Sequence, residues 1–262
     1  MSPNAYYNYK ASNKAAYYAQ KERVKETIAD IYHGYCGRPG YRMMAVFLSR
    51  RGIMLSKQTV HKYMKELNLR SIRTPKKPRY HKGECHKKFE DLLNQDFTAG
   101  SPNEKWCTDF TFLYLKDGAK RYNCSIIDLY DRSPVATLNG SRITAELAIE
   151  TLKIALGKNK VGGGLICHSD QGAQFTSKAF TEFCAGLGIR QSMSRAGCPY
   201  DNSPMESFYG TFKSEFVNEH SFETDDDLNN GTLDYIYCYY NHIRPHSYNG
   251  YLTPFEKRNS YR

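Results

Sequence analysis

The stretch from Lys105 to Leu115, KWCTDFTFLYL, places an acid in the middle of a strand pattern. Bulky residues at Trp106, Phe110 and Phe112 alternate with a second set of positions, and this period of two predicts a central β-strand. Asp109 belongs to the second set. A carboxylate that is buried without a partner raises its pKa or destabilises the fold, so Asp109 requires a specific explanation.

The rest of the chain from residue 102 alternates between strand-like and helix-like segments. Short apolar runs between turn residues predict strands, whereas apolar residues spaced by three and four predict helices. The expected strands span residues 105–115, 122–129, 135–141, 165–167 and 189–193, and the expected helices span 144–156, 177–187 and a segment beginning at 203. This order predicts an α/β fold with a five-stranded sheet flanked by helices.

Basic residues are concentrated in the first third of the chain. Residues 1–88 contain 20 Lys and Arg against 5 Asp and Glu, whereas residues 89–262 contain 17 against 22. This uneven distribution favours contact between the first third and the phosphate backbone of a nucleic acid. A merely solvated basic surface is the alternative.

Residues 1–69 are expected to form a small all-α domain with a helix-turn-helix at 40–69. Val60, Tyr63, Met64 and Leu67 recur at helical spacing after Ser56, which is a natural N-cap. The opposite face of this second helix has side chains suited to phosphates and base edges in a major groove. The expected DNA-contact residues on it are Lys57, Gln58, His61, Lys62 and Lys65. The alternative is a packing unit with an ordinary wet surface.

Residues 70–101 are expected to be a basic linker and an entry segment to the larger domain, 102–262, which includes a C-terminal extension. The linker is rich in Lys, Arg and Pro without an apolar period. His81, Cys85 and His86 lie close together in it, but no fourth ligand at suitable spacing favours a zinc site. The eight cysteines are scattered singly, which favours reduced, buried thiols over a disulfide framework.

The sequence has no run of 18 or more apolar residues, and its N-terminus lacks the apolar centre of a secretory signal. The cytoplasm is therefore the expected compartment, with no membrane contact.

Two further acids occur where ligand sites commonly form. Asp170 directly follows the strand expected at 165–167, and open α/β sheets bind ligands at the carboxyl ends of their strands. Glu206 is the expected third residue of a helix with Ser203 as its N-cap and Pro204 at its first position. Singly, a capping box explains Glu206, a turn explains Asp170, and a cationic partner explains Asp109. Together, the three acids offer several oxygens to hard cations.

The spacing of these acids resembles the DD35E triad of retroviral-type integrases and bacterial transposases, because 60 residues separate Asp109 from Asp170 and 35 separate Asp170 from Glu206. The surrounding sequence resembles the second-reading-frame transposase (OrfB) of the IS-three family of insertion sequences over about residues 20–257. The matching positions are Trp106, Asp109, Thr111, His168, Ser169, Asp170, Gly172, Phe175, Gly197, Asp201, Asn202, Pro204, Glu206, Ser207, Phe208, Lys213, Tyr240, Asn241, Arg244, Pro245, His246, Leu252, Thr253 and Pro254.

This resemblance implies a DDE integrase catalytic core with a ribonuclease-H-like mixed five-stranded sheet. It implies a DNA transposase that performs metal-dependent DNA strand cleavage and 3′-hydroxyl strand transfer during insertion-sequence transposition. Asp109, Asp170 and Glu206 would be the catalytic metal ligands for two Mg²⁺ (or Mn²⁺) ions. Arg195 and Lys213 are expected to contact DNA phosphates.

The implied partners are DNA, at element ends and target, and further copies of the chain on that DNA. In the family an upstream reading frame supplies a DNA-binding partner or a frameshift fusion, so this chain is expected to be part of the working enzyme. The paired His and Cys ligands of the retroviral N-terminal zinc domain are missing. Arg244 and His246 are expected to hold the C-terminal segment, with DNA contact as the alternative. The alternative functions are a purely hydrolytic ribonuclease-H-like nuclease, a noncatalytic DNA-binding regulator and a domesticated remnant.

Overall fold

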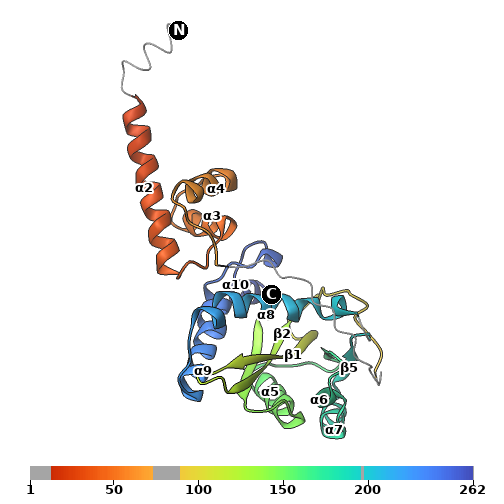
Figure 1. Cartoon of the computed structure of the whole chain (residues 1–262). Coiled ribbons are helices and arrows are strands. Elements are labelled where there is room, and N and C mark those ends of the chain that lie inside the picture. Colours follow the sequence, from red (N-terminus) through yellow and green to blue (C-terminus); the bar gives the residue numbers. More distant parts are fainter. Residues whose placement is uncertain (1–12, 73–88, 196–197, 262) are drawn as a thin grey trace. The chain divides into compact units, whose positions relative to one another are not determined.

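The computed structural model describes residues 13–72, 89–195 and 198–261. Contacts between residues divide the chain into two compact units, Met1–Thr74 and Pro75–Arg262, which are described separately (Figure 1). Residues 73–88 of the expected linker, including His81, Cys85 and His86, lie outside the described residues.

The described residues of the first unit form three helices, α2 (Asn13–Gly34), α3 (Tyr41–Arg50) and α4 (Lys57–Glu66). The backbone N–H of Thr59 donates to the Ser56 hydroxyl at 3.1 Å, so Ser56 is the N-cap of α4 as predicted. The buried residues of this unit are Val24, Ile28, Ile31, Met44, Phe47, Leu48, Val60, Tyr63 and Met64. Three of the apolar residues expected on the second helix of the helix-turn-helix, Val60, Tyr63 and Met64, therefore belong to this core, whereas Leu67 is only half-buried.

The second unit is built on a five-stranded mixed sheet. Its strands are β1 (Lys105–Tyr114), β2 (Lys120–Asp128), β3 (Pro134–Gly140), β4 (Ile166–Ser169) and β5 (Arg190–Met193). The strand order is β3-β2-β1-β4-β5, with antiparallel pairing among β1, β2 and β3 and parallel pairing of β1 with β4 and of β4 with β5. The predicted α/β fold with a mixed five-stranded sheet is confirmed.

Helices cover both faces of this sheet (Figure 1). One face carries α5 (Ala145–Lys158), α6 (Ala173–Thr176) and α7 (Lys178–Gly186), and the other carries α8 (Ser203–Glu215). Further along the chain follow η2 (Val217–Glu219), α9 (Asp225–Leu233), the π-helix η3 (Asp234–Tyr240), η4 (Ser247–Asn249) and α10 (Pro254–Asn259). The core beneath α5 and α7 includes Trp106, Ile126, Leu152, Phe175, Phe180 and Met193. The sheet is thus the middle of three layers, and the first half of its central strand β1 is buried on both faces at Trp106, Cys107 and Thr108, whereas Phe112 and Tyr114 near its end are exposed.

The start of α8 differs from the expectation by one residue. A 3-10 turn, η1 (Pro199–Asn202), runs directly into α8, so Ser203 already has helical dihedral angles and Asn202 is the N-cap. The side chain of Asn202 makes no capping hydrogen bond. The predicted Ser203 cap, and with it the capping-box explanation of Glu206, is wrong because the preceding turn extends the helical path of the backbone.

The end of α8 is tied to the C-terminal segment by a buried ion pair. The Arg244 guanidinium donates from Nε and Nη2 to the Glu215 carboxylate, both at 2.9 Å, and the Tyr235 hydroxyl donates to Glu215 Oε2 at 3.1 Å. Both charged side chains are buried. The structural role expected for Arg244 is confirmed, and His246 caps η4 through its ring Nδ1, which accepts from the Tyr248 N–H.

A second tether fastens α10 to the sheet. Arg258 donates to Asp131 and to Asp128, at 2.6 Å in each case, and both acids are fully buried. The described cysteines are all free thiols, and four of them are buried, namely Cys107, Cys124, Cys167 and Cys184. Cys36 and Cys238 are exposed, so the expectation of burial is wrong for those two.

Replacing Arg244 by Met is expected to lower the free energy of unfolding of the second unit by about 3–5 kcal/mol, because Glu215 would remain charged and unpaired in the interior. Trp106, the only tryptophan of the chain, is fully buried in this unit and reports its unfolding in denaturant by fluorescence. The double variant Arg244→Met/Glu215→Leu is expected to recover most of the loss. An unchanged unfolding midpoint in the single variant would contradict this role.

Candidate active site

Asp109 lies in the middle of β1, opposite Ser125 of β2, and is half-buried. Its Oδ1 accepts a hydrogen bond from the Phe110 N–H at 2.7 Å, and its Oδ2 accepts from Asn202 Nδ2 at 3.3 Å. The hydroxyl of Tyr209, on α8, donates to the backbone carbonyl of Asp109 at 2.7 Å. Asp109 is therefore held between the sheet and the start of α8.

Asp170 follows the last residue of β4, the parallel neighbour of β1. Cys107 pairs with His168 in this register, so two residues further along Asp170 comes level with Asp109. Its Oδ1 accepts from the Gly172 N–H at 2.9 Å, which fixes the carboxylate in a tight turn. The parallel pairing of β1 and β4 thus brings together two acids that are 60 residues apart in the sequence.

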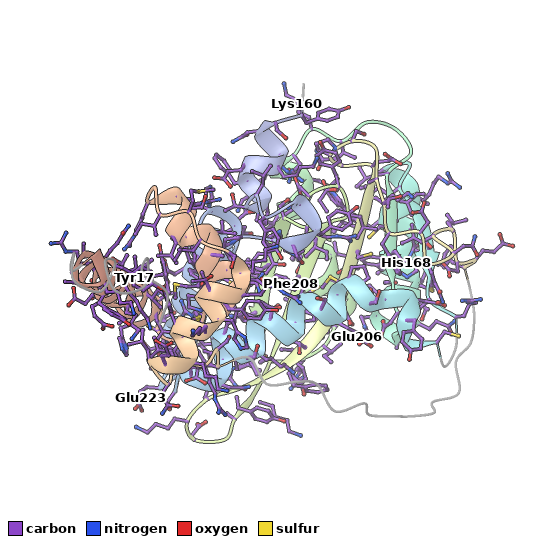
Figure 2. All side chains as sticks on the ribbon, turned by 90° about the horizontal axis from the view of Figure 1, so that it is seen from above. Tyr17, Lys160, His168, Glu206, Phe208 and Glu223 are labelled. Carbon is purple, nitrogen blue, oxygen red and sulfur yellow. The ribbon has the colours of Figure 1, made fainter. Side chains whose placement is uncertain are left out.

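The third acid, Glu206, lies in the first turn of α8, which runs across the sheet (Figure 2). Its side chain is exposed, and its charge acts on Asp109. Lys213, two turns further along the same helix, also acts electrostatically on Asp109. Helix α8 therefore carries an acidic and a basic residue that both act on Asp109.

The environment of Asp109 disfavours its charged form. Burial is the largest cause, the charges of Asp170 and Glu206 add to it, and together they raise the pKa of Asp109 to about 8. The Phe110 N–H and Lys213 act in the opposite direction. Burial also raises the pKa of Asp170, against the hydrogen bond from Gly172. Such strongly perturbed carboxyls at one place are typical of functional sites.

The donor set fits a hard divalent cation. Carboxylate oxygens are preferred ligands of Mg²⁺ and Mn²⁺, and a cation among Asp109, Asp170 and Glu206 would relieve the repulsion that raises the pKa of Asp109. In the part of the chain that the structure describes, however, no three His, Cys, Asp or Glu side chains converge closely enough to hold a metal ion. The three acids are neighbours here without forming a closed ligand set.

The turn before α8 carries a hydrogen-bond network that the sequence did not reveal. The Asp201 carboxylate is fully buried and accepts from Arg195 Nε at 2.9 Å, Arg195 Nη2 at 3.0 Å, the Arg195 N–H at 2.9 Å and Gln95 Nε2 at 2.8 Å. Arg195 lowers the pKa of Asp201 well below its usual range. The guanidinium of Arg195 is thus engaged within the protein, while its contact with DNA stays a prediction. Asp201 and Asn202 were recognised from the sequence as motif positions, and no contact was predicted for either.

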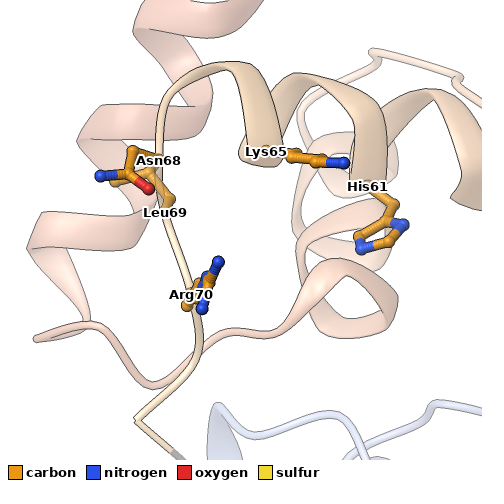
Figure 3. Close-up of a pocket in the computed structure, with 5 residues that line it drawn as sticks. All are labelled: His61, Lys65, Asn68, Leu69 and Arg70. Atoms are coloured by element: carbon orange, nitrogen blue, oxygen red, sulfur yellow. The ribbon is translucent and has the colours of Figure 1, made fainter.

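The five DNA-contact candidates of the first unit lie on one exposed face of α4, opposite Val60, Tyr63 and Met64. The exposed candidates are Lys57, Gln58, His61, Lys62 and Lys65. A pocket of about 350 Å³ opens between this face and the residues after the helix (Figure 3). Its lining consists of His61, Lys65, Asn68, Leu69 and Arg70. Lys65 and Arg70 give this pocket a positive charge, while most of its lining surface is apolar.

Family models match both units of the chain. An HTH-like domain matches residues 19–77, and two integrase core domain models match residues 99–199 and 187–254. The transposase for insertion sequence element IS904 of Lactococcus lactis subsp. lactis (strain IL1403) is 36% identical over 244 residues, covering 92% of this chain and 96% of the relative. The chain belongs to the insertion-sequence transposases of the IS-three family.

Other relatives agree with this family. The putative transposase InsK for IS150 of Escherichia coli (strain K12) is 35% identical over 254 residues, covering 97% of this chain and 88% of that protein. Transposase InsF for insertion sequence IS3A of the same strain is 37% identical over 172 residues, covering 65% and 59%. The resemblance read from the motifs is thereby confirmed, and the chain is a DNA transposase of the DDE type.

The fold agrees with a solved relative of the integrase class. The simian T-cell lymphotropic virus intasome, solved by cryo-electron microscopy with the PP2A regulatory subunit B56 gamma, contains a chain that matches at a TM-score of 0.52 and 18% identity. The match covers 83% of this transposase and 75% of that chain. The expected ribonuclease-H-like fold is therefore confirmed. Integrase-core enzymes are metal-dependent.

No helix among the described residues of the transposase is long and apolar enough to cross a membrane.

The raised pKa of Asp109 predicts a pH-dependent stability in metal-free buffer. Folded protein holds a proton on Asp109 that the unfolded chain releases above about pH 4, so stability is lost as pH rises towards 8. The variant Asp109→Asn lacks this loss, and its advantage over the parent in free energy of unfolding is expected to grow by up to about 1.4 kcal/mol per pH unit between pH 5 and 8. Urea unfolding titrations in EDTA, repeated across this pH range, measure the difference in free energy of unfolding.

The exposed acid Glu182, changed to Gln, is the matched control and is expected to give no growing difference with pH. A constant difference between Asp109→Asn and the parent over the same range would contradict the burial and repulsion assigned to Asp109.

Proposed function

We propose that this transposase cuts DNA at the ends of an insertion element and joins the freed 3′-hydroxyl to target DNA, using Asp109, Asp170 and Glu206 as metal ligands. The observation that supports this most is the position of Asp109, on the strand that pairs with β4 and in contact with Asn202 at the start of the helix that carries Glu206. The charges of Asp170 and Glu206 both raise its pKa. Family membership supplies the reaction class, and the acids supply the site for it.

Two Mg²⁺ or Mn²⁺ ions bound by these carboxylates would activate the attacking oxygen and stabilise the leaving oxygen of a phosphodiester. The acids serve as ligands in this proposal and form no bond to DNA. Lys213 lies near Asp109 and provides a positive charge for an adjacent DNA phosphate. Asp109 must lose its proton to act as a ligand, so metal binding and proton release are coupled.

The exposed face of α4 is the proposed DNA-binding surface of the first unit. Its basic and amide side chains suit phosphates and base edges. Contact with both element ends and target DNA requires several DNA-binding surfaces, which further copies of this chain and an upstream-frame partner would supply.

Each of the variants Asp109→Asn, Asp170→Asn and Glu206→Gln is expected to abolish metal-dependent cleavage and joining, because each removes one anionic ligand. The loss is expected to exceed the roughly 10–100-fold cost of removing an outer-shell partner. Labelled element-end DNA on denaturing gels measures both products, and a gel-shift assay is expected to show unchanged DNA binding. Glu182→Gln is the control of equal charge change.

The same gels separate the alternative functions. Strand cutting retained in any one of the three variants would refute the assigned triad. Cleavage without joined products would indicate a hydrolytic nuclease, and DNA binding without cleavage under any metal would indicate a regulator.

The DNA-binding surface has its own test. Replacing Lys57, Lys62 and Lys65 together by Ala is expected to weaken DNA binding and to lower the slope of log K against log salt by about 0.9 for each lost phosphate contact. Lys178, which is exposed on α7, provides the matched control as Lys178→Ala. An unchanged salt slope in the triple variant would place the DNA contact elsewhere.

A further inference from the structure

Asn202 occupies the junction between η1 and α8, four residues before Glu206. Residues four apart on a helical path lie on the same face, one turn from each other. Asn202 is 6% exposed, although it stands at the edge of a site that must admit a cation and DNA. Its side chain is therefore packed inside the unit, where it contacts Asp109 of β1.

The carboxamide of Asn202 is only half satisfied. Its Nδ2 donates to Asp109 Oδ2 at 3.3 Å, whereas its buried Oδ1 has no hydrogen-bond donor among the residues that the structure describes. A buried polar atom left in this way costs about 1–3 kcal/mol, and such atoms in native proteins call for an explanation. A half-turn of the amide exchanges its oxygen and nitrogen, so either end can face Asp109.

The backbone beneath Asn202 is held firmly. Its neighbour Asp201 accepts the four hydrogen bonds from Arg195 and Gln95 described above, which fasten η1 to β5 and to the entry segment. Asn202 is also the N-cap of α8, yet its side chain makes no capping bond to the helix. Asn is a common N-cap residue, but the amide of Asn202 contacts Asp109 of β1 and makes no capping bond to α8.

We propose that Asn202 is a fourth oxygen ligand of the acidic site, whose carboxamide oxygen joins Asp109 in binding the divalent cation. Amide oxygens are ordinary ligands of hard divalent cations. A neutral ligand completes the oxygen set without adding to the repulsion among the three carboxylates. The inference rests on the proposed metal site and goes beyond the acidic triad.

The test measures Mn²⁺ binding to the full-length chain without DNA, by electron paramagnetic resonance of the free ion. Asn202→Ala removes the oxygen, and it is expected to weaken Mn²⁺ binding about 10-fold or more. Asn202→Asp keeps an oxygen but loses the donor to Asp109, and it is expected to bind Mn²⁺ within about threefold of the parent or more tightly.

Asn249 provides the matched control. It is also 6% exposed, its Nδ2 donates to the Asp131 carbonyl at 2.7 Å, and its Oδ1 has no donor among the described residues. Asn249→Ala removes an equivalent buried amide outside the acidic site, and it is expected to leave Mn²⁺ affinity unchanged. If Asn202→Ala fails to fold, as judged by Trp106 fluorescence, Asn202→Leu replaces it, with similar volume and no oxygen.

Two results would overturn the inference. Parental affinity in Asn202→Ala or Asn202→Leu would show that the oxygen binds no cation. An equal loss in Asn202→Asp would show that Asn202 only donates to Asp109. The variant Asp109→Asn separates these results from failure of the proposed function. If the parent binds no more Mn²⁺ than Asp109→Asn does, the triad itself fails as a metal site, whereas strong parental binding with a normal Asn202→Ala refutes the fourth ligand alone.

Discussion

Burial of an acid on the central strand is the constraint on which this transposase depends. Asp109 is placed against the sheet core and beside two other acids, and the cost of its charge appears as a pKa of about 8. The surrounding elements maintain this unfavourable arrangement. Parallel pairing of β1 and β4 sets Asp170 level with Asp109, and the Tyr209 hydroxyl fixes α8 to the backbone carbonyl of Asp109. The fold thus stabilises a site that is locally destabilising.

The helix that carries Glu206 is tethered at both ends. Asp201 and its bonds from Arg195 and Gln95 hold the turn before α8, and the buried pair of Glu215 with Arg244 holds its last turn. The Gln95–Asp201 bond and the Glu215–Arg244 pair join segments far apart in the sequence, whereas Arg195 and Asp201 are near neighbours in it. Glu215 and Arg244 are both buried, so loss of one partner is costly there, whereas the Arg195 side chain that binds the buried Asp201 is half-exposed.

Much of the fold was readable from local patterns. The alternation in KWCTDFTFLYL predicted β1, and the spacing of Val60, Tyr63 and Met64 predicted α4, because these periods follow from the geometry of strands and helices. The cap of α8 was predicted one residue too late, since the 3-10 turn η1 runs directly into the helix, and Asp201 in that turn binds both nearby Arg195 and distant Gln95. Arg195 was predicted to contact DNA, because the sequence around a basic residue does not indicate whether its side chain binds a buried acid.

By itself, the sequence determined the class of the protein: the order of strands and helices, the basic first third, and three acids at spacings that match the IS-three family. These properties depend on residue type and spacing, so they can be recognised in the sequence alone. Only the tertiary structure decided which atoms meet. The register of β1 with β4, the junction of η1 and α8, and the amide of Asn202 against Asp109 arise from long-range packing and hydrogen bonding, whose geometry no single segment encodes.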